Sequence, residues 1–107
     1  MTFAEYEAQA AKTVNPKLTK NERLLDSAAG LSEEAGEILA LVRKHAFQSK
    51  SLEQDRIKEE LGDALWCLAM TARHAGTSLQ DVAQANIAKL RSRYPDGYQD
   101  RSPMESK

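Results

Sequence analysis

Apolar residues recur at spacings of three and four along most of this chain, and this helical period is the feature that most restricts its fold. Four periodic segments each open with a possible capping box, in which two side chains three positions apart bond the free N–H groups of a helix start. The pairs are Thr2 with Glu5, Thr19 with Glu22, Ser51 with Gln54 and, as a weaker match, Ser78 with Asp81. No segment alternates apolar and polar residues as a strand does. The sequence therefore predicts an all-α fold.

The predicted helices cover residues 3–13, 20–47, 52–75 and 79–93. Proline disfavours helix in the residue before it, so Pro16 and Pro95 mark the ends of the first and the last helix. Gly76 suits the left-handed position that follows a helix. The connections are short, so successive long helices should be antiparallel. We expect a four-helix bundle protomer built on a long antiparallel hairpin. One domain should cover residues 1–95, and a polar tail, 96–107, should be mobile or contact another subunit.

Composition narrows the class of protein. The net charge of the 107 residues is −1 with 29% charged residues, which argues against a binder of nucleic-acid polymers or anionic membranes. Cys67 is the only cysteine, so no disulfide forms within the chain and a reducing, cytoplasmic setting is expected. No apolar run is long enough to span a membrane. A chain this short buries a small core, which makes a homodimer or homotetramer a natural way to gain stability.

Two short acidic motifs carry the chemistry. Glu34 and Glu37 form one pair, and Glu60 and Asp63 form another. Residues three apart share a face of a helix, and the second pair lies in an apolar run that includes Trp66. Carboxylates on an apolar face need a cation or a hydrogen-bond donor. Oxygen ligands of this kind suit Mg²⁺, with Mn²⁺ as a possible substitute.

The spacing of the two motifs predicts that they meet. The midpoint between them falls within Gln48-Ser49-Lys50-Ser51, where the cap pattern places the turn of the hairpin. At about 1.5 Å of rise per residue, the two pairs then lie at nearly the same height on facing helices. The alternative is a solvated acidic face with ion pairs along each helix, which is the usual role of such residues.

The predicted fourth helix adds groups that suit an anion. Asn86 falls on its apolar stripe, and Lys89 and Arg93 follow along one edge of that face. A Lys ammonium or an Arg fork is well suited to phosphate oxygens. The alternative is that Asn86 is a polar residue of the bundle core and that the two cations are ordinary surface charges.

At these residues the chain resembles the MazG-like all-α nucleoside triphosphate pyrophosphohydrolases. The similarity lies in Leu31-Ser32-Glu33-Glu34-Ala35-Gly36-Glu37-Ile38, in Glu60-Leu61-Gly62-Asp63-Ala64-Leu65-Trp66 and in the segment from Asn86 to Pro95. The related phosphoribosyl-ATP pyrophosphohydrolases usually have an Ala-Asp-Leu-x-Tyr-His type of second motif, which this chain lacks. The resemblance covers residues 6–98 and indicates a compact single-domain member.

The resemblance implies hydrolysis of a (deoxy)nucleoside triphosphate between the α and β phosphates, which yields a monophosphate and pyrophosphate. By carry-over, Mg²⁺ is bound by four carboxylates: Glu34, Glu37, Glu60 and Asp63. Glu33 would be a further ligand or a base for water. Substrate contacts would come from Asn86, Lys89, Arg93, Tyr94 and Trp66. Tyr94 is equally suited to core packing, and a Trp in an apolar helix more often lies in the core or at a subunit interface. The family forms dimers or tetramers, and a role in nucleotide-pool cleaning is expected.

Two other functions fit the same residues. One is hydrolysis of another phosphoanhydride, such as phosphoribosyl-ATP or a sugar nucleotide. The other is a non-catalytic helical module whose carboxylates bind a structural cation or a basic partner. A purely structural metal site would not need Asn86, Lys89 and Arg93, which favours the enzyme.

Overall fold

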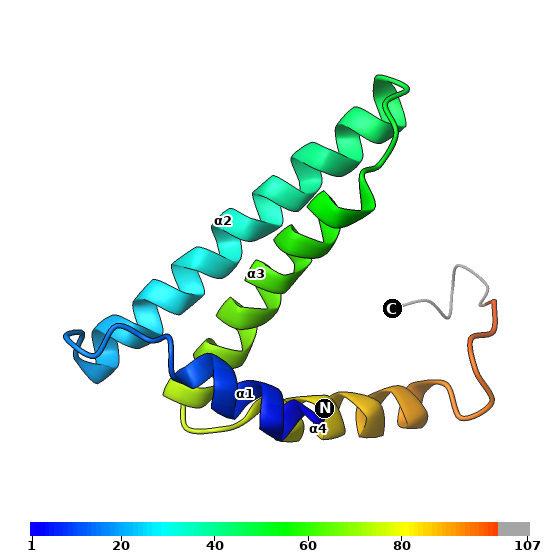
Figure 1. Cartoon of the computed structure of the whole chain (residues 1–107). Helices are drawn as coiled ribbons and strands as arrows, with labels where there is room; N and C mark the ends of the chain where they lie inside the picture. Colours follow the sequence, from blue (N-terminus) through cyan, green and yellow to red (C-terminus); the bar gives the residue numbers. More distant parts are fainter. Residues whose placement is uncertain (101–107) are drawn as a thin grey trace.

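The computed structural model describes residues 1–100, and these form four helices (Figure 1). The helices are α1 (Phe3–Ala11), α2 (Lys20–Phe47), α3 (Gln54–His74) and α4 (Leu79–Arg93). The only β-type pairing in residues 1–100 is an isolated bridge between Pro95 and Gly97, so the all-α class is confirmed. Of the predicted tail, residues 101–107 lie outside the described residues. No helix in the described part combines the length and the hydropathy needed to cross a membrane.

Most helix ends follow the predicted caps. Thr2 and Thr19 each form a complete capping box, with Glu5 and Glu22 respectively, and the Ser78 hydroxyl accepts from the N–H of Asp81 at 3.1 Å. Helix α3 ends in a turn that requires Gly76, whose φ is +91°. There the N–H of Thr77 donates to the carbonyl of Ala72, the bond that defines a Schellman motif.

Two predicted ends were wrong. The Ser51 cap does not form, because α3 begins later, after the extended residue Glu53, which makes no side-chain cap bond. The connection between α2 and α3 reverses the chain direction at Ser49, whose φ is +54°. It also includes residues 52 and 53, which were predicted to begin the helix. Helix α1 ends at Ala11 instead of residue 13, since the Thr13 hydroxyl donates to the carbonyl of Ala10.

The predicted antiparallel hairpin is confirmed and forms the body of the molecule. Helices α2 and α3 run side by side along their length, and α1 and α4 lie next to each other at the open end of the hairpin (Figure 1). Helix α4 contacts α1 and α3 but has no contact with α2. A hydrogen bond of 3.0 Å from the Thr71 hydroxyl to Ser27 joins the two long helices. Beside it, a Cβ on Gly30 would lie 2.8 Å from the Cys67 sulfur, so the approach needs glycine.

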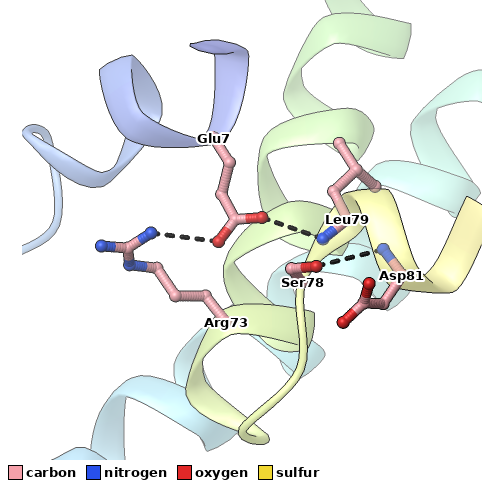
Figure 2. Close-up of polar contacts among 5 residues, drawn as sticks. All are labelled: Glu7, Arg73, Ser78, Leu79 and Asp81. Carbon is pink, nitrogen blue, oxygen red and sulfur yellow. Dashed lines mark hydrogen bonds and ion pairs between the residues drawn. The ribbon is translucent and has the colours of Figure 1, made fainter. Parts of the chain in front are cut away.

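A small core and a polar anchor hold the two short helices. The core consists of Ala10, Ala69, Met70 and Leu79, and the half-buried Trp66 packs against it. The buried Glu7 of α1 accepts from the Arg73 guanidinium at 3.0 Å and from the N–H of Leu79 at 2.8 Å (Figure 2). One carboxylate therefore ties α1 to the end of α3 and to the start of α4.

Much of the apolar surface of the hairpin remains uncovered in this single chain. Five of the exposed apolar side chains on α2 and α3 are Leu25, Leu39, Val42, Leu61 and Leu68. Leu25 retains 71% of its accessible surface. Apolar side chains left exposed on two long helices are typical of an interface between proteins.

Candidate metal centre

Three of the four predicted ligands meet between the long helices. Glu34 and Glu37 come from α2 and Glu60 comes from α3. Each offers a carboxylate oxygen, and these three oxygens lie within 4.8 Å of one another. The two residues of α2 share a face because they are three positions apart, and the hairpin register brings Glu60 opposite them.

The cluster is partly shielded from solvent and lacks hydrogen-bond donors. Glu60 is buried, Glu34 is half-buried and Glu37 is exposed. The Oε1 atoms of Glu34 and Glu60 are both buried, and neither has a hydrogen-bond partner. Buried carboxylate oxygens are normally satisfied by a donor or a cation, because losing water without replacement is costly. These oxygens therefore fit a divalent cation with a preference for oxygen ligands.

The electrostatics of the cluster point the same way. The Glu34 side chain, close enough to share a proton with Glu60, is the largest cause that raises the pKa of Glu60 above its usual range, and burial adds to it. The neighbouring Glu37 side chain acts in the opposite direction, and the charge of Asp63 raises the pKa further. The nearest cation is Arg56, whose Nε lies 3.7 Å from Oε2 of Glu60. One loose ion pair does not offset three clustered carboxylates, so a bound cation would relieve their repulsion.

Asp63, the fourth predicted ligand, lies one turn further along α3 and is exposed. It is outside the group of three oxygens, although its negative charge acts on Glu60. The same charge acts on Tyr6 of α1, where burial, then Cys67 and then Asp63 raise the pKa of the phenol. Asp63 therefore lies between the carboxylate cluster and the base of the hairpin.

A groove of about 450 Å³ opens beside the cluster on α2. Its lining residues are Glu33, Gly36, Glu37, Ala40, Leu41, Lys44 and Arg56. Glu33 thus lies next to the cluster, as predicted from its place in the first motif. Lys44 and Arg56 were not predicted as site residues. Their spacing in the sequence could have indicated this position. Lys44 follows Glu37 by two helical turns and Arg56 precedes Glu60 by one, so each cation lies on the same helix face as an acid of the motifs.

The predicted substrate contacts of the fourth helix do not reach this groove within one chain. Asn86 and Lys89 are exposed on α4, which makes no contact with α2. Arg93 and Tyr94 line a separate cavity of about 290 Å³ with residues 95–97, 99 and 100. Trp66 donates its indole N–H to the Thr13 hydroxyl at 2.8 Å and packs against the core, which matches the packing alternative for this residue.

Comparisons with known proteins point to one family. A family model described as the MazG nucleotide pyrophosphohydrolase domain matches residues 23–98, which include both acidic motifs and all of α4. The chain is 36% identical over 72 residues to the Gene 37 protein of Mycobacterium phage L5, in a match that covers 64% of this chain and 63% of the phage protein. It is 33% identical over 73 residues to the uncharacterized protein YvdC of Bacillus subtilis (strain 168), with 60% of this chain and 69% of that protein covered. The chain thus spans less than two thirds of the phage relative. No solved structure matches it.

Proposed function

This chain belongs to the MazG nucleotide pyrophosphohydrolase family, and we propose that it is a Mg²⁺-dependent enzyme that cleaves a nucleoside triphosphate between the α and β phosphates. The products are a nucleoside monophosphate and pyrophosphate. The observation that carries the proposal is the pair of buried, unpartnered oxygens on Glu34 and Glu60, next to a groove that holds both acids and cations. A structural ion pair would have satisfied those oxygens internally.

In this proposal Glu34, Glu37 and Glu60 bind the metal, with Asp63 as a fourth ligand from the next turn of α3. Bound Mg²⁺ supplies the positive charge that neutralises phosphate oxygens and makes water easier to ionise. The chain would supply a fixed set of ligands, because the two long helices hold three of the carboxylates relative to one another. Glu33, which lines the groove beside Glu37, accepts the proton of the attacking water.

We also propose that the working form is a homodimer or a homotetramer. The uncovered apolar side chains of α2 and α3 provide a surface for a second copy. The second copy would also bring its own α4 to the groove, which would place Asn86, Lys89 and Arg93 near the substrate phosphates. The metabolic role that fits this reaction is the removal of unwanted nucleotides from the pool.

The test is turnover of a panel of canonical and modified NTPs and dNTPs with and without Mg²⁺, with both products identified. Metal-dependent release of monophosphate and pyrophosphate is the expected result. The Glu37→Gln variant should lose at least about a hundredfold in rate while keeping its helical circular dichroism, since a metal ligand is removed without loss of volume. Glu59→Gln, an exposed acid on α3, is the matched control and should keep its activity. Release of diphosphate and phosphate, or equal activity of Glu37→Gln and wild type, would refute the proposal.

A further inference from the structure

We propose that Lys44 and Arg56 bind the β and γ phosphates of the substrate, so that the phosphate chain lies along α2 from the carboxylate cluster toward the tip of the hairpin. The inference rests on the proposed function and adds a direction to it. The nucleoside would then lie toward the base of the hairpin. Selection for a triphosphate over a diphosphate follows, because only the longer chain reaches from the cluster, where Arg56 lies beside Glu60, to Lys44.

The groove places opposite charges at its two ends. Glu33 and Glu37 lie at one end, and Lys44 lies at the other. Lys44 is seven residues beyond Glu37, which corresponds to about 10 Å along the helix axis. This length is comparable with the extent of a phosphate chain. A metal at the carboxylates, Arg56 beside Glu60 and Lys44 nearer the tip would contact successive phosphates of one chain.

Lys44 and Arg56 both have N–H donors available to bind phosphate oxygens. In the described part of the chain, the Lys44 side chain has no hydrogen bond or ion pair, although it borders a groove that contains acids. Arg56 is paired with Glu60, but at 3.7 Å its Nε is too far for a hydrogen bond, and the side chain is 55% exposed. A guanidinium has five N–H donors, so this contact leaves a fork available for phosphate oxygens.

The surroundings toward the base of the hairpin suit the other end of a nucleotide. Beyond Glu60 in that direction lie Asp63 and then Tyr6 of α1, whose phenol is close enough to be affected by the charge of Asp63. Tyr6 packs on the apolar core beside Trp66. None of these three residues lines the groove, which extends from Glu33 and Glu37 toward Lys44. The extent of the groove therefore assigns the phosphates to the tip side.

The experiment measures product binding separately from turnover. Pyrophosphate and, in a second titration, a nucleoside monophosphate are added to the full chain in the presence of Mg²⁺, and affinities are measured by calorimetry. Lys44→Gln should weaken pyrophosphate binding by at least about tenfold, the size expected for a charge-assisted hydrogen bond, and should leave monophosphate binding unchanged. Lys58→Gln removes the same charge from an exposed position on α3 outside the groove and is the matched control. Circular dichroism verifies that each variant is folded.

Four outcomes would overturn the inference: undetectable pyrophosphate binding by wild type, unchanged pyrophosphate affinity in Lys44→Gln, an equal loss in Lys58→Gln, or a loss confined to the monophosphate. The last would mean that the substrate lies in the opposite direction. Wild-type turnover on the same samples separates the two proposals. Hydrolysis of triphosphates with a pyrophosphate affinity insensitive to Lys44 would refute the inference alone. Lys44-dependent pyrophosphate binding without hydrolysis of any triphosphate would support the phosphate site and refute the proposed function.

Discussion

Substitution of Glu7 by Gln should destabilise the whole fold, because one carboxylate joins three helices. Glu7 is only 7% exposed and accepts two hydrogen bonds, from the Arg73 guanidinium and from the N–H of Leu79 (Figure 2). Leu79 is the first residue of α4, where the positive end of the helix dipole favours a negative charge. A glutamine of the same size has one carbonyl oxygen for the two donors, and its amide group faces the remaining donor.

The expected loss can be worked out contact by contact. Removal of the charge from the helix start costs about 1 kcal/mol. The Arg73 side chain is 47% exposed, so its pair with Glu7 contributes no more than about 1 kcal/mol. The donor left facing an amide adds a penalty of similar size. The free energy of unfolding should therefore fall by about 2 kcal/mol, with a range of about 1–3, which lowers Tm by roughly 10 °C in a domain this short.

The assay is urea unfolding followed by far-UV circular dichroism at one protein concentration, since any assembly would make stability depend on concentration. Arg73→Gln should cost less than Glu7→Gln, because it leaves the Leu79 bond intact. The double variant should show a coupling of about 0.5–1 kcal/mol between the two residues. A loss of less than about 0.5 kcal/mol for Glu7→Gln would show that this anchor does not hold the short helices.

Three further predictions follow from the hairpin. The raised pKa of Glu60 means that its ionisation opposes folding, so the metal-free protein should lose stability as pH rises above 4.5. The Glu60→Gln variant should not show this loss, and added Mn²⁺ should no longer stabilise it. Both effects are measured by thermal unfolding. Burial, and after it the charge of Arg23, lowers the pKa of His74 below 6.5, so stability should fall as pH drops below that value, and His74→Gln should flatten this part of the urea-midpoint profile. Gly30→Ala should cost roughly 1–2 kcal/mol in wild type, and a stabilising effect of about 1 kcal/mol is expected in Cys67→Ala; equal effects in both backgrounds would contradict the close contact.

The sequence alone was sufficient for the helices and for the meeting of the two acidic motifs. Helix period, capping pairs and Gly76 are short-range signals, and each acts within one or two turns of the chain. The register of a hairpin follows from its turn, so Glu37 and Glu60, at equal distances from residues 48–49, face each other, and Glu34 lies one turn along α2 from Glu37. Even the error at Ser51 arose locally, where an extended connection replaced the first turn of α3.

Only the tertiary structure decided which other groups share the site. The sequence patterns and the resemblance predicted that Asn86 and Lys89 contact the substrate beside the carboxylates. Within one chain α4 points away from that site, because Glu7 and the small core hold its first residues beside α1. Lys44 and Arg56 border the groove instead, since the packing of α2 on α3 exposes that face. Such choices depend on contacts between residues far apart in the chain, and a local period contains no information about them. The buried, unpartnered oxygens of the cluster likewise became visible only once the helices were packed together.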